Sequence, residues 1–486
     1  MGTPVKIPSF KNGIRRLPLQ YLPFADAASD GLPMLRLLRL SLFQVTVGMS
    51  AALMVGTLNR VMIVELGVAA WLVALMVAIP LLVAPFRAVT GFRSDTHRSA
   101  FGWRRVPFIW TGTMLQFVGL TFMPFALLVL TGQGDIKTPM WLNQAIAALS
   151  FLMVGIGLQT SQTAGLALAT DLADEPTRPR VVALMYVMLL VGMVGSSFFF
   201  SWMLQDFTPQ KMIQVIQGHA LLTLVLNAVA LWKQEARDPL RAAALKLQPV
   251  PVFKDAWTAF INNGKARRFL AMLALGTAAF NMQDIVLEPY GGEILKLSVS
   301  ATTMLTALMA SGSLLAFAVA SRKLSGGVDP LRLAAYGLVC GLPAFSAVIF
   351  AAPLDANWLF YAGVFCIGFG AGLFSVSTLA AAMTMERKEF VGLALGAWGG
   401  VQATAAGLSI AFGGAARDFV SSLALQGSLG PALAVPVTGY SFVYYAEICL
   451  LFITLAAIGP LVRRATLSSA TQPGKPERFG LADLPG

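Results

Sequence analysis

Residues 282–293 read Met-Gln-Asp-Ile-Val-Leu-Glu-Pro-Tyr-Gly-Gly-Glu and place Gln283, Asp284 and Glu288 late in an apolar run that begins near Arg268. A charged side chain inside a bilayer costs several kcal/mol unless it is paired or faces a polar cavity. Such residues are therefore candidates for function by default. This stretch decides how the whole chain is interpreted, because it has a counterpart near the N-terminus.

The counterpart is a cluster of Asn59, Arg60 and Glu65 at the end of an apolar run that begins near Leu37. The two clusters fall at corresponding places, in the first helix of each half of the chain. We expect both near the non-cytoplasmic ends of helices one and seven, lining the interface between the halves and pairing with each other or with a polar cargo group. The alternative is structural: Arg60 and Glu65 reach the lipid headgroups, and Glu288-Pro289 ends a helix.

Composition indicates an integral membrane protein. The chain has 486 residues, of which 57% are hydrophobic and 12% are charged, whereas a soluble protein carries about 25% charged residues. A membrane span needs roughly 20 apolar residues. On this basis the sequence predicts an all-α fold with twelve transmembrane helices, over residues 37–62, 69–91, 107–130, 141–169, 181–204, 214–232, 268–288, 301–320, 331–351, 358–382, 390–414 and 439–461.

The distribution of basic residues predicts the topology. Lysines and arginines gather before the first span, in alternate loops and in the C-terminal tail. By the positive-inside rule both termini are predicted to be cytoplasmic, which agrees with an even number of spans. The formal net charge of +12 therefore marks the cytoplasmic face of a protein that lies in the lipid bilayer, and we predict no nucleic-acid partner.

Several functional classes are excluded or disfavoured by what the sequence lacks. Cys340, Cys366 and Cys449 lie in predicted spans without paired spacing, so neither a disulfide nor a metal site is predicted. The two histidines, His97 and His219, are too few for a protein that holds many histidine-ligated pigments. No Gly-x-x-x-x-Gly-Lys-Ser/Thr motif is present, which excludes ATP-driven transport within this chain. No catalytic arrangement appears, so we do not predict an enzyme.

The longest polar connection divides the spans six and six. The predicted organisation is a cytoplasmic N-terminal segment (1–36), a first six-helix bundle (37–232), a cytoplasmic linker (233–267), a second six-helix bundle (268–462) and a cytoplasmic tail (463–486). A faint internal repeat relates residues 168–195 to residues 379–407, since each runs from one span through a charged turn into a glycine-rich span. Two six-helix repeats with a central loop are the organisation of a major facilitator superfamily transporter.

The loop between the second and third predicted spans supports this fold. It resembles the superfamily's signature there, a Gly, an Asp and a Gly followed by basic residues, although the spacing from Asp95 to Gly102 is longer than the usual pattern. We expect Asp95 to cap or pair with a helix end while arginines reach across the cytoplasmic interface. The alternative is that the arginines only determine topology. The motif residues are Gly91, Asp95, Arg98, Gly102, Arg104 and Arg105.

A further polar stretch lies in the fourth predicted span, where residues 155–162 read Gly-Ile-Gly-Leu-Gln-Thr-Ser-Gln. Gln159 and Gln162 make it polar enough to line a cavity, although amides in membrane helices commonly bond one another between helices. Helices one, four, seven and ten are the expected cavity-lining set by analogy with the fold alone.

Three strings resemble the PucC/LhaA family, the bacteriochlorophyll delivery branch of the major facilitator superfamily. They are residues 56–66 (Gly-Thr-Leu-Asn-Arg-Val-Met-Ile-Val-Glu-Leu), residues 92–99 (Phe-Arg-Ser-Asp-Thr-His-Arg-Ser) and the helix-seven string 282–293. The resemblance extends over nearly all of the chain, from about Tyr21 to Val462.

This resemblance implies an assembly factor for light-harvesting complexes in the inner (intracytoplasmic) membrane of a photosynthetic purple bacterium. It also implies partners: light-harvesting antenna polypeptides and the machinery of bacteriochlorophyll synthesis and membrane insertion. Bacteriochlorophyll would be bound transiently and delivered. Its magnesium accepts oxygen or imidazole ligands, and transient delivery favours weak ones such as an amide, a carboxylate or water. As a hypothesis, Asn59, Gln283 or Asp284 contributes to pigment or antenna-helix binding.

Two other functions stay open at this point. In a proton-coupled secondary transporter, Arg60 would bind a small anionic or amphiphilic substrate and Asp284 or Glu288 would carry a proton. In a pigment-free assembly chaperone, the glycine-rich surfaces would bind antenna helices. Proton-dependent uptake into vesicles would identify the transporter, and the absence of co-purified pigment would identify the chaperone.

Overall fold

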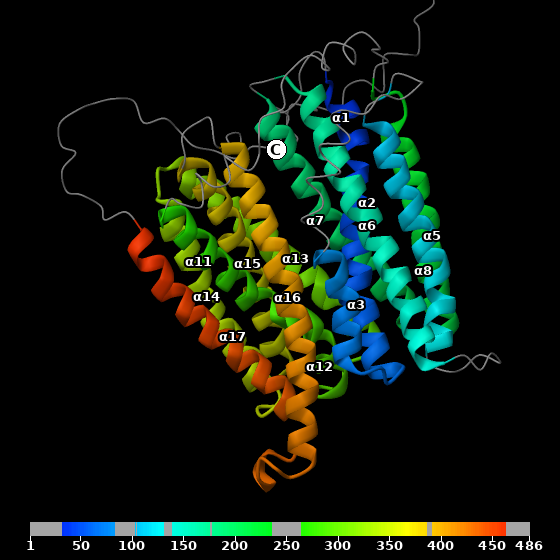
Figure 1. Ribbon diagram of the computed structural model, residues 1–486, viewed down its shortest axis with the longest axis vertical. Coiled ribbons are helices and arrows are strands. Elements are labelled where there is room, and N and C mark those ends of the chain that lie inside the picture. Colours follow the sequence, from blue (N-terminus) through cyan, green and yellow to red (C-terminus); the bar gives the residue numbers. More distant parts are fainter. Residues whose placement is uncertain are drawn as a thin grey trace, which may run out of the picture.

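The computed structural model describes residues 32–82, 103, 105–130, 139–174, 177–235, 264–385 and 391–462. Within these residues all regular secondary structure is helical, and eleven helices are long and apolar enough to cross a membrane. A shorter apolar helix, Ala70–Leu82, occupies the position of the second predicted span. All twelve predicted spans therefore overlap an apolar helix (Figure 1).

The first helix of the chain is a composite of short segments that together make one span, Met34–Glu65. Its parts are α1 (Met34–Leu40), α2 (Leu42–Ala51) and two π-helical segments, η4 (Ala52–Leu58) and η5 (Val61–Glu65). The helices that follow are α3 (Ala70–Leu82), α5 (Val106–Leu130), α6 (Met140–Leu172), α7 (Arg178–Met203) and α8 (Pro209–Leu231).

The seventh span is also interrupted. It consists of α11 (Gly264–Asn281), a 3-10 turn η8 (Met282–Ile285) and α12 (Leu287–Glu293). The later helices are α13 (Val299–Ser325), α14 (Pro330–Ala351), α15 (Asn357–Met385), α16 (Val391–Leu425), η10 (Pro431–Leu433), α17 (Val437–Ile458) and η11 (Gly459–Leu461).

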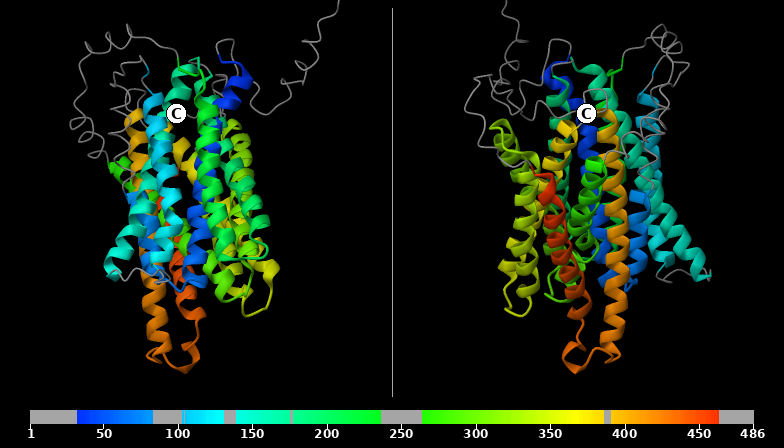
Figure 2. Two further views of the ribbon diagram at one scale, coloured as in Figure 1. Left: turned by 90° about the vertical axis from the view of Figure 1, so that its right-hand side faces the viewer. Right: turned by 60° about the vertical axis from the view of Figure 1, so that its left-hand side comes forward.

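The helices form two groups that lie side by side (Figures 1 and 2). Helices α1 to α8 pack mainly among themselves, as do α11 to α17, and the main contacts between the groups are α3 against α16 and α7 against α13. We call the end of the bundle at which α1 begins the proximal end. The opposite end, where η5 and α12 finish and α3 begins, is the distal end. The distal end is the one that the sequence predicts to be non-cytoplasmic.

The departures from α-helical geometry occur at corresponding places in helices one and seven. The π-helical segments η4 and η5 flank Asn59 and Arg60, and the 3-10 turn η8 carries Gln283 and Asp284. Interrupted membrane helices leave backbone groups to be satisfied by neighbours and often mark functional sites. The two segments that carry the predicted polar clusters are thus also the two that deviate from regular helix.

The predicted span 390–414 is too short, since α16 continues to Leu425 and its end projects beyond its neighbours at the distal end (Figure 2). Hydropathy falls after residue 414 because Arg417 and Asp418 interrupt the apolar pattern. These two side chains are paired within the structure, and the helix therefore runs on past them. Gly427, with φ of +74°, follows the end of α16.

Candidate functional site at the junction of the two bundles

The two predicted polar clusters meet. The side-chain amide of Asn59 donates to the main-chain carbonyl oxygen of Asp284 at 2.8 Å and to Oε2 of Glu288 at 3.4 Å. Asn59 is fully buried and Glu288 is 4% exposed. These bonds join the first helix of one bundle to the first helix of the other, as the sequence predicts for residues at the interface between the halves.

Close approach of the first helix to α13 depends on Gly56. A Cβ atom at this position would lie 2.2 Å from Oγ1 of Thr306 on α13 and 3.6 Å from Oε1 of Glu288. The Thr306 hydroxyl in turn donates to Oε1 of Glu288 at 3.3 Å. The π-helical segment η4 therefore packs its backbone directly against the pair Glu288 and Thr306.

Gln283 connects the cluster to α17. Its backbone N–H donates to Oε1 of Glu447 at 2.6 Å, and its side-chain amide donates to Oδ1 of Asp284 at 2.5 Å. Gln283 and Glu447 are both fully buried. We call this group the junction cluster; it comprises Asn59, Gln283, Asp284, Glu288, Thr306 and Glu447.

The other two predicted residues of the first cluster form a separate pair beside it. Arg60 forms an ion pair with Glu65 and donates from Nη2 to the carbonyl oxygen of Leu297 at 3.3 Å. The guanidinium is buried and lies against Gly292, where a Cβ atom would be 2.8 Å from its Nε. Arg60 is thus held within the protein and contacts the second bundle. The alternative interpretation requires instead that Arg60 extends towards the headgroups.

Glu447 was not selected from the sequence, although the signal was present. It lies within the predicted span 439–461, and the rule that draws attention to Asp284, an ionisable group inside an apolar run, applies to it equally. What the sequence cannot show is that the eleventh residue of α17 lies beside η8, because no local pattern links positions so far apart.

A second polar network at the distal end was also missed. Arg417 donates to Oε2 of Glu293 at 2.6 Å and to the Tyr440 hydroxyl at 2.8 Å. Its neighbour Asp418 accepts a hydrogen bond from the backbone N–H of Trp71 at 2.8 Å. This N–H lies in the first turn of α3, where backbone N–H groups have no acceptor within the helix. The bond from Trp71 to Asp418 joins the two bundles, whereas the contacts of Arg417 lie within the second bundle.

Gln159 and Gln162 do not join the junction cluster. Both lie on α6 within the first bundle; Gln162 is buried, and Oε1 of Gln159 is buried without a hydrogen bond among the described residues. Their neighbour Ser161 accepts a hydrogen bond from Gln116 on α5 at 3.1 Å, which is interhelical amide bonding of the ordinary kind.

Most of the predicted loop motif lies outside the described residues, namely Gly91, Asp95, Arg98, Gly102 and Arg104. Arg105 is described. Its Nε donates to Oδ2 of Asp171 at 3.0 Å, and its backbone N–H donates to the carboxylate of Glu235 at 3.0 Å. Arg105 therefore links the beginning of α5 to the ends of α6 and α8 at the proximal end.

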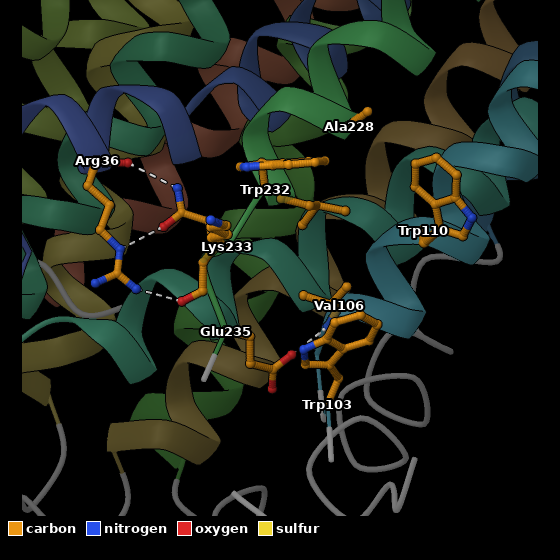
Figure 3. Close-up of a pocket in the computed structure, with 10 residues that line it drawn as sticks. Arg36, Trp103, Val106, Trp110, Ala228, Trp232, Lys233 and Glu235 are labelled. Atoms are coloured by element: carbon orange, nitrogen blue, oxygen red, sulfur yellow. Dashed lines mark hydrogen bonds between the residues drawn. The ribbon is translucent and has the colours of Figure 1, made fainter. Parts of the chain in front are cut away.

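A pocket of about 660 Å³ lies beside this contact, between the beginnings of α1 and α5 and the end of α8 (Figure 3). Three indole side chains line it, Trp103, Trp110 and Trp232. Trp232 is 65% exposed and Trp110 is 41% exposed. Exposed tryptophans at helix ends are typical of the boundary between bilayer and water.

The fold is that of the major facilitator superfamily. A solved structure of a bacterial homologue of the lysosomal transporter Spinster covers 87% of this chain and 95% of its own, with a TM-score of 0.65 at 15% identity. A crystal structure of the nucleoside transporter NupG matches over 88% of this chain and 100% of its own, with a TM-score of 0.62 at 13% identity. At these identities the likeness concerns the fold alone.

The sequence comparisons show the family. The model of the PUCC protein family matches residues 57–466, and the chain belongs to that family. It is 56% identical over 411 residues to Protein PucC of Rhodovulum sulfidophilum, covering 84% of this chain and 90% of the relative. It is 51% identical over 476 residues to an uncharacterized protein of the puhA-bchM intergenic region of Rhodobacter capsulatus, covering 97% and 98%. Family membership points to a role connected with the photosynthetic complexes of purple bacteria.

Proposed function

We propose that the protein is an assembly factor for bacterial light-harvesting complexes that binds bacteriochlorophyll and delivers it to antenna polypeptides in the inner membrane. The observation that carries this proposal is the family match over residues 57–466 together with PucC relatives at 50% to 56% identity. The fold and the family point to a membrane protein that moves or holds a cargo and performs no chemistry on it.

The junction cluster offers ligands of a suitable kind. Oδ1 of Asn59 and Oε1 of Gln283 are buried and accept no hydrogen bond among the described residues. An unsatisfied buried amide oxygen is costly and is readily satisfied by a partner. The magnesium of a chlorin prefers oxygen ligands, and a neutral amide oxygen binds it weakly enough to permit release. These two atoms are therefore our candidates for transient axial ligands.

Access to these ligands requires movement. Asn59 and Gln283 are fully buried, and the first helix is in direct contact with Thr306 through Gly56. A macrocycle reaches the amide oxygens only when the two bundles separate at the junction cluster. Delivery in this proposal therefore includes opening and closing of that contact, as in a transporter fold.

The partners in this proposal are antenna polypeptides and the machinery of bacteriochlorophyll synthesis and membrane insertion. The membrane is the bacterial inner (intracytoplasmic) membrane, with both termini on the cytoplasmic side. The eleven long apolar helices support a multi-pass protein, and the charge distribution of the loops supports this orientation.

The test is an absorption spectrum of the protein purified in mild detergent from its native pigmented membrane. We expect bacteriochlorophyll at a near-stoichiometric level, and we expect Asn59→Ala combined with Gln283→Ala and Asp284→Ala to lose it. Asn281→Ala is the matched control, because the side-chain amide of Asn281 donates to the main-chain carbonyl oxygen of Thr277 within its own helix, at 2.8 Å, and to no other group among the described residues. Normal pigment content and antenna assembly in the triple variant would refute the proposed site.

A colourless protein that still brings down antenna polypeptides would instead identify a pigment-free chaperone. The second candidate function is a proton-coupled secondary transporter of a small anionic or amphiphilic substrate. The observation that favours it is the presence of three carboxyl groups in the junction region, Asp284, Glu288 and Glu447, that form no ion pair among the described residues. Uptake into vesicles that depends on a proton gradient would support it.

A further inference from the structure

Three carboxyl groups lie together in the membrane-spanning part of the protein and form no ion pair with any described cationic side chain. Glu447 is fully buried, Glu288 is 4% exposed and Asp284 retains partial exposure. Gln283 links Asp284 to Glu447, since it donates to both carboxyl groups. Glu288 is the second residue of α12, the next segment of the same span, and follows Asp284 by four positions.

Among the described residues, the arginines at the distal end, Arg60 and Arg417, are paired with other carboxylates. Arg60 pairs with Glu65. Arg417 pairs with Glu293 at 2.6 Å and with Asp418 at 2.8 Å. Every hydrogen bond to the carboxyl groups of Asp284, Glu288 and Glu447 among the described residues comes from a neutral donor.

A second observation points to a missing proton. Oε2 of Glu447 and the hydroxyl of Tyr444 are both buried without a hydrogen-bond partner among the described residues, and both residues are fully buried. Tyr444 precedes Glu447 by one turn of α17, so the two side chains lie on the same face of this helix. The described hydrogen bonds leave this cluster with more acceptors than donors. A proton on a carboxyl oxygen turns that oxygen from an acceptor into a donor.

The energetic cost of burying charge also favours protonated carboxyl groups. An ionised carboxylate removed from water is strongly disfavoured unless it is paired, and neighbouring carboxylates repel one another in a low-dielectric interior. A metal ion would also neutralise the group, but within the described residues no set of three His, Cys, Asp or Glu side chains has an arrangement that could hold one. Protons satisfy both the charge and the hydrogen bonds.

The charged and titratable groups of the surrounding elements complete the environment. The first helix contributes Arg60 and Glu65, α12 contributes Tyr290 and Glu293, and α16 contributes Arg417 and Asp418; α17 adds Tyr440 beside Tyr444. Among the described residues of α3 none is ionisable, and those of α11 and α13 stand at their proximal ends.

We propose that Asp284, Glu288 and Glu447, together with the Tyr444 hydroxyl, form a proton-binding site that is loaded while the junction cluster is closed and releases protons when it opens. Asn59 links the site to the other bundle through its bond to Glu288. Opening removes that donor and admits water, which stabilises the ionised carboxylates. Protons leave to water and return from it, so that the step involves no other reactant. The site works independently of the identity of the cargo.

The test is infrared spectroscopy of the purified full-length protein in lipid nanodiscs at neutral pH. A protonated carboxyl group shows a C=O stretch that ionised carboxylates lack and that shifts in heavy water. We expect this band in the wild-type protein, its loss in alkaline buffer, and a reduced band in each of Glu447→Gln, Glu288→Gln and Asp284→Asn. Gln at position 447 retains the acceptor for the Gln283 N–H, which favours correct folding, and gel filtration checks it.

Asp206→Asn is the control, because Asp206 is 94% exposed and its loss leaves the cluster unchanged. A wild-type protein without the band at neutral pH would overturn the proposal. So would an undiminished band in folded Glu447→Gln, or a carboxylate spectrum that responds to sodium in place of pH. None of these readouts involves pigment or antenna, so they are separate from the test of the proposed function.

Discussion

The side-chain amide of Asn59 bonds the main-chain carbonyl oxygen of Asp284 at 2.8 Å, although 225 positions separate them in the chain. The donor lies between two π-helical segments and the acceptor lies in a 3-10 turn. Each helix is thus irregular where it contacts the other. The carbonyl oxygen that an unbroken helix would use internally is available to the opposite bundle.

Replacement of Asn59 by alanine should weaken this contact. The change removes the donor to Asp284 and to Glu288 and leaves their oxygens buried, which costs about 1–3 kcal/mol. We expect a lower melting temperature of the purified protein and reduced antenna assembly in cells. Asn281→Ala removes one bond within a single helix and should have a smaller effect. Equal decreases in melting temperature and antenna assembly in the two variants would show that the contact between the bundles contributes no more than a bond within one helix.

Gly56→Ala should keep the bundles apart at the junction cluster. The added methyl group would lie 2.2 Å from Oγ1 of Thr306, so the first helix or α13 must shift. Overpacking of this kind costs about 1–3 kcal/mol. Gly195→Ala is the matched control, because a Cβ at Gly195 has no neighbour within 4 Å. We expect Gly56→Ala to unfold at a lower temperature than Gly195→Ala. Identical thermal unfolding curves would contradict the close packing at Gly56.

Arg417→Lys should destabilise the distal network even though the charge is kept. Arg417 reaches Glu293, Asp418 and the Tyr440 hydroxyl at once, and a single ammonium group lacks the planar set of donors that allows this. We expect a loss of about 1–3 kcal/mol. Lys211→Ala breaks the exposed pair with Asp206 and should cost at most about 1 kcal/mol. Chemical unfolding in detergent would measure both.

Sequence reasoning could predict the spans because hydropathy is a local property. It also selected Asn59, Gln283, Asp284 and Glu288, since polar groups in apolar runs are rare and the two runs correspond. The predicted eleventh span ends at residue 414, whereas α16 continues past Arg417 and Asp418. The partners of these two residues, Glu293 and Trp71, come from distant parts of the chain, so their pairing is not visible in a local hydropathy pattern.

Glu447 illustrates the remaining limit. Its residue type and position were visible, yet its importance depends on a bond to the backbone N–H of Gln283, 164 positions away. The interruption of helix seven at η8 frees that N–H, and no periodicity in the sequence reports it. Tertiary contacts of irregular backbone are thus the part of the site that a single sequence does not specify.

A cross-link between the bundles should prevent the distal end from opening. The hydroxyl groups of Ser201 on α7 and Ser300 on α13 lie 2.8 Å apart and join the two bundles. In a protein whose native cysteines are replaced, Ser201→Cys with Ser300→Cys should form a disulfide under oxidation, because the two side chains already touch. If the bundles must separate for delivery, oxidation should reduce pigment exchange by the purified protein to background, and a reductant should restore it.

The control pair is Thr113→Cys with Asn227→Cys. These side chains are 2.9 Å apart but lie within the first bundle, on α5 and α8. A disulfide there ties together helices that the proposal treats as one body, so exchange should continue. Exchange that proceeds at the wild-type rate with the Ser201–Ser300 disulfide formed would show that delivery does not need the junction to open. Loss of exchange with both disulfides would instead indicate a general effect of cross-linking, and the separation of the bundles would then lose its support.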